Sequence, residues 1–289
     1  MRDSAVLLID CPDRRGLVAR VSGLLYAHGA NILHADQHRD EDLGLFFMRI
    51  EWALSSGEEA GVSFGMDAFR REFEQLALEL QMRWRLAVMR EKTRVALFCS
   101  HYTHCLADLL HRWKNGELHC DIPLVVSNHH EAEPLARFYG VEFAHVPVSV
   151  QNRAAAEEHQ LRLLEEHGID LIVMARYMQV LSPDFIKRYP SRIINVHHSF
   201  LPAFSGARPY HAAHQRGVKL IGATSHYATD VLDDGPIIEQ DVARISHRDD
   251  VSDLVARGRD LERVVLSRAV QWHLEHRILT YGNKTVVFD

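Results

Sequence analysis

The chain has 289 residues, and at about 150 residues per domain this length predicts two domains. Hydrophobic residues make up 47% of the chain and charged residues 25%, which excludes a disordered or collagen-like protein. The formal net charge is −6 and the basic residues are not clustered, so we expect no nucleic-acid partner. No apolar run approaches the roughly 20 residues that cross a bilayer, and no signal peptide is recognisable. We therefore expect a cytoplasmic protein with no membrane partner and with reduced cysteines.

Residues 1–88 show a complete pattern of their own. Strand-like apolar runs and helix-like spacings of 3 and 4 follow one another in the order β-α-β-β-α-β, over residues 5–11, 17–29, 31–38, 44–52, 66–81 and 83–89. This order predicts a ferredoxin-like unit.

Two segments of this unit, Asp13-Arg14-Arg15-Gly16-Leu17-Val18 and Gly29-Ala30-Asn31-Ile32, resemble an ACT domain. The resemblance implies a regulatory or oligomerisation domain, a homo-oligomer, and a small effector such as an amino acid near the first strand–helix turn. Gly16 would leave helix amides free for a carboxylate. The candidate effector contacts are therefore Asp13, Gly16 and Asn31, and a purely structural pairing module is an equal alternative.

After a polar linker at 89–93, residues 94–289 alternate between strands and helices. Apolar strands are expected at 94–99, 122–126, 143–146, 170–174 and 193–196. Helices are expected at 105–113, 131–139, 152–167 and 250–277. Continuous apolar strands between helices predict a mostly parallel sheet in a Rossmann-like, doubly wound α/β domain. Ligands of such sheets bind beyond the carboxyl ends of the strands.

Polar side chains gather where the last of these strands ends. Asn195 and His197 lie there, and His226 and Asp233 come later in the chain. An amide can donate to an oxyanion, an imidazole can do the same or move a proton, and a carboxylate can activate water. Singly, Asp233 is typical of a turn and His197 of a structural hydrogen bond. Together with Asn195 and His226 they favour a site for acyl chemistry.

The 20 His residues raise the question of a metal site. Two pairs, His101 with His104 and His211 with His214, have the i, i+3 spacing that could hold a metal on a helix. Neither pair has a carboxylate or Cys partner at a known spacing, and His273-Leu274-Glu275-His276 is not the zinc motif His-Glu-x-x-His. We therefore predict no metal.

The polar residues belong to a longer pattern: Asn195 and His197 before Ser199-Phe200-Leu201-Pro202, then Gly222-Ala223-Thr224-Ser225-His226, then Asp233 before Ile237-Ile238-Glu239-Gln240. This pattern resembles the folate-dependent formyltransferase family over residues 93–289. The resemblance implies 10-formyltetrahydrofolate as formyl donor, no cofactor beyond this folate substrate, and four catalytic residues: Asn195, His197, His226 and Asp233. Residues 175–182 match the segment that borders the pterin, and the expected folate contacts are Met178, Gln179, Val180, Leu181, Thr224, Thr229 and Asp230.

The loop after the first strand of this domain bears on the acceptor of the formyl group. Ser100-His101-Tyr102-Thr103-His104 contains no glycine, whereas relatives that act on a ribose phosphate carry a glycine-rich phosphate loop there. The acidic net charge disfavours tRNA. Water remains, and together with the ACT domain the chain most resembles the deformylases of the family. The resemblance implies metal-independent hydrolysis of 10-formyltetrahydrofolate to formate and tetrahydrofolate, in one-carbon metabolism and purine biosynthesis. We expect Asp233 to activate the water and Asn195 and His197 to stabilise the oxyanion. Transfer to an unphosphorylated amine and a non-catalytic folate or amino-acid sensor remain open.

Overall fold

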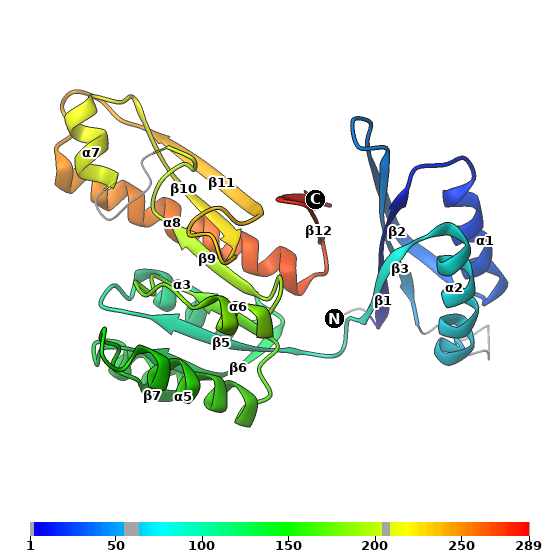
Figure 1. Ribbon diagram of the computed structural model, residues 1–289, viewed down its shortest axis with the longest axis horizontal. Coiled ribbons are helices and arrows are strands. Elements are labelled where there is room, and N and C mark those ends of the chain that lie inside the picture. The colour runs from blue at the N-terminus through cyan, green and yellow to red at the C-terminus, as the bar shows by residue number, and fades with distance from the viewer. Residues whose placement is uncertain (1–2, 55–63, 204–208, 289) are drawn as a thin grey trace. The chain divides into compact units, whose positions relative to one another are not determined.

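The computed structural model describes residues 3–54, 64–203 and 209–288 (Figure 1). Contacts within it divide the chain into two units. The first comprises Met1–Lys92 with Glu275–Leu279 and Val286–Asp289, and the second comprises Thr93–Leu274 with Thr280–Thr285. The sequence-based division at 89–93 lies close to this boundary, but it gave both C-terminal segments to the second domain. Across the described residues, no helix combines the length and apolar character that crossing a membrane requires.

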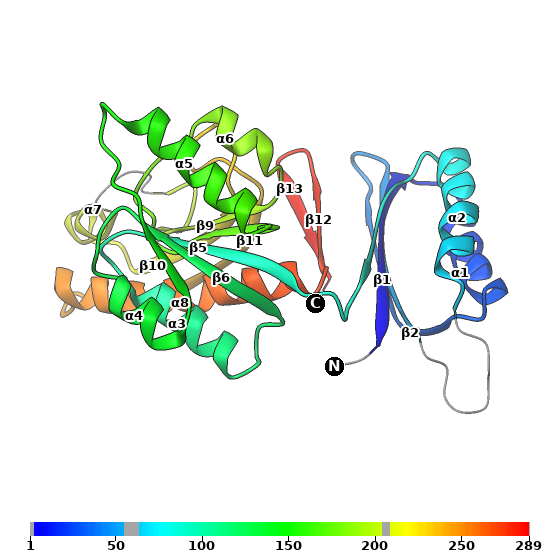
Figure 2. The ribbon, with the colours of Figure 1, turned by 90° about the horizontal axis from the view of Figure 1, so that it is seen from below.

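The first unit is a four-stranded antiparallel sheet with two helices on one face (Figures 1 and 2). Its elements are β1 (Ser4–Pro12), α1 (Leu17–Ala27), β2 (Asn31–Asp40), β3 (Leu45–Ala53), α2 (Met66–Leu80) and β4 (Arg83–Val88). The strand order is β2-β3-β1-β4. Alternate residues of β1, Leu7 and Ile9 among them, pack with Phe69 and Phe73 of α2 in one buried core. The predicted ferredoxin-like β-α-β-β-α-β order is confirmed.

The second unit is a seven-stranded sheet of order β11-β10-β9-β8-β5-β6-β7. The parallel part contains β5 (Thr93–Cys99), β6 (Cys120–Ser127), β7 (Glu142–His145), β8 (Leu171–Met174) and β9 (Ile193–His197). Two antiparallel strands extend it, β10 (Leu220–Tyr227) and β11 (Ile237–Arg244). The predicted mostly parallel, Rossmann-like sheet is confirmed.

Helices cover both faces of this sheet (Figure 2). The helices are α3 (His104–Lys114), α4 (Glu133–Tyr139), α5 (Arg153–Glu166), α6 (Pro183–Arg188), α7 (Pro209–Arg216) and α8 (Val251–Leu274). Because β5 pairs with β6 on one side and with β8 on the other, the order of the chain reverses there. The loops after β5 and β8 therefore flank the position where such sheets bind ligands.

The last helix is shorter than its sequence pattern suggests. We expected it to run to residue 277, but α8 ends at Leu274 and His276 adopts a left-handed backbone with φ 51°. A left-handed residue cannot continue a right-handed helix. The chain then forms the two-stranded pair β12 (Ile278–Tyr281) and β13 (Lys284–Val287).

Candidate active site

Asn195 and His226 face each other across neighbouring strands. The antiparallel pairing of β9 with β10 places them directly opposite, and Nδ2 of Asn195 lies 3.2 Å from Nε2 of His226. Nδ1 of His226 lies 3.0 Å from the backbone carbonyl oxygen of Tyr227. Because a carbonyl only accepts hydrogen bonds, Nδ1 carries the proton. Nε2 of His226 therefore faces the Asn195 side-chain amide.

Asp233 reaches this pair from the loop between β10 and β11. One carboxylate oxygen, Oδ2, lies 3.1 Å from Nδ1 of His197, and the other, Oδ1, lies 3.7 Å from Nε2 of His226. The residue has a left-handed backbone with φ 55°, which Asp tolerates better than most residues. The loop is closely fitted, because a Cβ at Gly235 would lie 1.7 Å from the Tyr227 carbonyl oxygen. Only glycine fits there without moving the backbone that carries Asp233.

The two imidazoles determine the charge of Asp233. Burial disfavours the charged carboxylate, but hydrogen bonds and charge interactions with His197 and His226 outweigh burial and hold the pKa of Asp233 well below its usual range. The side chain is therefore ionised at neutral pH.

A cavity of about 40 Å³ lies against these groups. Asn195, His226 and Asp233 line it, and so do four of the predicted folate contacts: Gln179, Val180, Leu181 and Thr229. The structure thus brings together two segments that are far apart in the sequence. Apolar residues that the sequence analysis did not name complete the wall: Met174, Ile186, Ala228 and Leu232. In the sequence, Met174 and Ile186 cannot be told from ordinary core residues of a strand and a helix.

Other predicted residues have different positions. The hydroxyl of Thr224 donates to the carbonyl of Ser199 (2.9 Å) and accepts from the N–H of Leu201 (3.0 Å), so it holds the loop after β9. Asp230 is exposed, and neither it nor His197 is among the described residues that line the cavity. Nε2 of His197 is buried without a hydrogen-bond partner among the described residues. Met178 lines a second cavity instead.

The second cavity has a volume of about 250 Å³ and surrounds another acid, Glu262 of α8, whose side chain is only 1% exposed. Oε1 of Glu262 accepts from the Tyr210 hydroxyl (2.7 Å), and Oε2 lies 2.8 Å from Nε2 of His104 and 3.4 Å from Nε of Arg176. Burial raises the pKa of Glu262, but His104, Arg176 and Tyr210 together lower it below its usual value. The sequence analysis missed this cluster. Its only signal is the spacing of four from Leu254 through Gly258 to Glu262, which places the acid on a buried helix stripe.

The candidate effector residues of the first unit lie near its first strand–helix turn. The carboxylate of Asp13 forms an ion pair with Arg39 (2.6 Å), and Gly16 precedes α1 with φ 88°. Asn31 is exposed at the start of β2. The positive φ explains glycine at position 16. Binding of an amino acid there remains a prediction.

Comparison with known proteins covers the whole chain. Residues 93–270 match the formyl transferase family and residues 5–51 the ACT domain family. The chain is 51% identical to a formyltetrahydrofolate deformylase of Synechocystis sp., over 99% of this chain and 98% of that protein. It is 48% identical to a Bacillus subtilis protein of the same name, over 99% and 94%. The crystal structure of a formyltetrahydrofolate deformylase from Pseudomonas syringae pv. tomato superposes with a TM-score of 0.96 at 47% identity, covering 100% of this chain and 95% of that one.

Proposed function

Since the chain belongs to the formyltetrahydrofolate deformylase family, whose members are hydrolases acting on a carbon–nitrogen bond, we propose that it hydrolyses 10-formyltetrahydrofolate to formate and tetrahydrofolate. One observation supports this proposal from the residues of this chain. Asn195, His226 and Asp233 converge on a single cavity that also borders the predicted folate segment Gln179–Leu181.

The reaction needs a group that stabilises negative charge. Water attacks the formyl carbon and gives a tetrahedral intermediate with a charged oxygen. Collapse of the intermediate breaks the bond between carbon and N10, and N10 leaves with a proton. In the proposal, Nδ2 of Asn195 donates a hydrogen bond to the charged oxygen, because this amide lines the cavity. An oxyanion donor of this kind contributes about 10²–10³-fold to the rate.

The reaction also needs a group that holds water and takes its proton. Asp233 and His226 both line the cavity, and at 3.7 Å from Nε2 of His226 the Oδ1 atom of Asp233 has capacity for a water molecule. A lowered pKa keeps Asp233 charged but makes it a weak base on its own. We assign proton uptake to the carboxylate and the His226 imidazole as a coupled pair, which then returns the proton to N10.

His197 acts through Asp233 in this proposal. Its Nδ1 donates to Oδ2 of the carboxylate, and its ring is not among the described residues that line the cavity. It is therefore a positioning residue, which holds the charged oxygen of Asp233 in place.

Water as acceptor is supported by the loop after β5. His104, the first residue of α3, is hydrogen-bonded to Glu262, and the sequence from Ser100 to His104 contains no glycine. A ribose phosphate needs backbone amides that side chains do not obstruct, and this loop does not provide them.

The test is incubation of the purified protein with 10-formyltetrahydrofolate alone. We expect equal amounts of formate and tetrahydrofolate without any added amine, and turnover slower by about 10²–10⁴-fold for Asp233→Asn protein under the same conditions. A strict requirement for an amine, with the formyl group recovered on it, would show a transferase. Absence of turnover, with folate still bound, would show a sensor. A chelator should leave the rate unchanged. A loss of activity on chelation that added zinc or iron reverses would contradict metal-free hydrolysis.

A further inference from the structure

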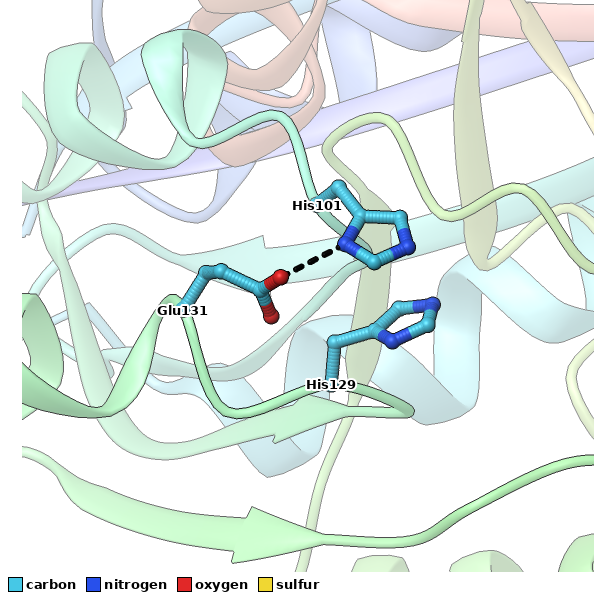
Figure 3. Close-up of side chains that lie close together, drawn as sticks. All are labelled: His101, His129 and Glu131. Atoms are coloured by element: carbon cyan, nitrogen blue, oxygen red, sulfur yellow. Dashed lines mark hydrogen bonds and ion pairs between the residues drawn. The ribbon is translucent and has the colours of Figure 1, made fainter.

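A second group of ionisable side chains lies at the carboxyl edge of the parallel strands, apart from the residues assigned to formyl chemistry. His101 comes after β5, and His129 and Glu131 come after the neighbouring strand β6 (Figure 3). Nδ1 of His101 lies 2.7 Å from Oε1 of Glu131, and the rings of His101 and His129 stack with their centroids 3.4 Å apart. One ligand atom from each of the three residues lies within 4.8 Å of the other two.

We propose that His101, His129 and Glu131 bind a divalent first-row transition metal ion of the Zn²⁺ class. Two imidazole nitrogens and one carboxylate oxygen form a donor set that suits such ions, and the open positions are left to water. This site lies outside the proposed hydrolysis and does not depend on it.

The dimensions of the group fit such an ion. Metal–ligand distances of about 2.0–2.2 Å place the donor atoms of a tetrahedral site roughly 3.4 Å apart. The ligand atoms of the three residues lie within 4.8 Å of one another, so a small movement of the side chains brings them to this spacing. The side chains of His101 and Glu131 are 57% and 51% exposed, so they can move and an ion can reach them from solvent. Two further imidazoles, His130 and His145, stack beside the group with their centroids 3.7 Å apart.

Among the described residues, one other group has metal-ligand spacing, and its surroundings argue against an ion. It consists of His104, Cys105 and Glu262. The Arg176 guanidinium lies 3.4 Å from the Glu262 carboxylate and supplies the positive charge that a metal would bring. Burial raises the pKa of the Cys105 thiol well above its usual value, and a metal needs the thiolate. A metal ion at the first group would have only nitrogen and oxygen ligands, whereas one at the second group would also have the Cys105 sulfur. The two sites can therefore be distinguished by the atoms that bind the ion.

An ion bound at His101, His129 and Glu131 would join two loops that already meet at one point. Ser100 donates its hydroxyl to Oδ1 of Asn128 (2.7 Å) and accepts the N–H of Met178 (3.0 Å). His101 and His129 are the next residues of these two loops. Because an ion that binds only the folded protein stabilises it, Zn²⁺ should raise the temperature of thermal unfolding.

The experiment uses the full chain without a histidine tag, stripped with a chelator and titrated with Zn²⁺ in a calorimeter. We expect one equivalent to bind with a micromolar or lower Kd. Because even outer-shell partners contribute about 10-fold or more to metal affinity, loss of a direct ligand in His101→Ala or Glu131→Gln should weaken this binding by at least that factor and reduce the rise in unfolding temperature. The matched control is His167→Ala, which removes another His–Glu pair of the second unit (3.2 Å, with Glu142) and should leave binding unchanged.

Co²⁺ identifies the ligands directly. We expect visible absorption bands without the near-ultraviolet band that marks a cobalt–sulfur bond. A cobalt–sulfur band would transfer the site to Cys105 and overturn the proposal. So would Zn²⁺ binding that neither His101→Ala nor Glu131→Gln reduces, because the ion would then be held by other histidines.

Discussion

Asp233 and Glu262 are two acids of the same unit in similar electrostatic surroundings, yet they are suited to different tasks. Each contacts imidazole, and the pKa of each is lowered although burial alone would raise it. Both oxygens of Glu262 are occupied, one by Tyr210 at 2.7 Å and the other by His104 at 2.8 Å. For Asp233, Oδ2 has a partner at 3.1 Å, but the contact of Oδ1 is 3.7 Å long.

The difference between the two acids lies in this second oxygen. A charged oxygen that lines a cavity and lacks a short partner can hold water, whereas one with all its partners in the protein stabilises the fold. The backbone agrees with this distinction, since Asp233 is on a loop with positive φ and Glu262 is within α8. Loops held by a rigid scaffold carry functional residues more often than helix interiors do. A lowered pKa alone would not have separated the two residues.

The largest effect is expected at Asp233. Asp233→Asn removes the charge that holds water, and we expect kcat to fall by about 10²–10⁴-fold while the protein stays folded. The matched control is Asp234→Asn, since Asp234 is the neighbouring acid in the same loop. The assignment of Asp233 as the acid that holds water is wrong if Asp233→Asn keeps more than half of the activity and Asp234→Asn does not.

Glu262→Gln should show the opposite pattern. Removing one member of a buried ion-pair network leaves Arg176 and His104 without their carboxylate, and we expect a loss of about 3 kcal/mol in the free energy of unfolding. The control is Glu158→Gln, whose 74%-exposed side chain pairs with Arg162 and should contribute less than about 1 kcal/mol. Urea unfolding and kcat are measured on the same samples. A stable but inactive Glu262→Gln protein would place Glu262 in the chemistry.

Two glycines allow a finer test, because each lies beside one of the acids. A Cβ at Gly235 would lie 1.7 Å from the Tyr227 carbonyl oxygen, and one at Gly258 would lie 2.1 Å from the Tyr210 hydroxyl. Gly235→Ala must shift the loop that carries Asp233, and a displacement of about 1 Å can cost 10²-fold in rate. Gly258→Ala should displace Tyr210 from Glu262 and lower stability more than kcat. If both substitutions lowered kcat and stability equally, the distinction between Asp233 as a reacting residue and Glu262 as a stabilising residue would be contradicted.

The smallest effect concerns His276, a buried imidazole for which the described residues provide no carboxylate partner. Burial, together with the charges of Arg85 and Arg49, lowers the pKa of His276 to about 4. The unfolded imidazole takes up a proton near pH 6.5, so this residue should reduce stability progressively as the pH falls from about 6.5 to about 4. The two acids behave differently, because the stability they provide is lost only below their unfolded pKa values.

His276→Asn should flatten the pH dependence of the urea-unfolding midpoint between pH 7.5 and 5, and Asn tolerates the left-handed backbone at this position. His247→Asn, in an exposed loop, is the control. A slope that His276→Asn leaves unchanged would show that other groups cause the pH dependence.

The sequence was most informative where apolar periodicity and polar strand ends coincide. The first unit and the position of Asn195 near the carboxyl end of β9 follow from that pattern. Strand β10 was not predicted, because Thr224, Ser225 and His226 are polar although all three are buried. Thr224 and His226 are buried with hydrogen-bond partners from distant segments, Ser199 and Leu201 for Thr224 and Asn195 for His226, and a local sequence pattern does not contain such partners.

The histidines show the same limit. Their i, i+3 spacing suggested that His101 and His104 could act together on a helix, but α3 begins at His104. His101 therefore lies in the loop before it, and the two residues join different groups, one with Glu131 and the other with Glu262. Their partners are 30 and 158 residues away in the chain.

The return of the C-terminus to the first unit bears on biosynthesis. Nε of Arg49 donates to the carbonyl of His276 (3.0 Å), and its Nη2 to that of Glu275 (3.2 Å). These acceptors leave the ribosome 227 and 226 residues after Arg49. The first unit can collapse around its apolar core early, but the hydrogen bonds of Arg49 form only after residues 93–274 of the second unit have been synthesised. The first unit is therefore completed only after most of the second unit has been made, and a ribosome that stalls within the second unit leaves a first unit without its later segments.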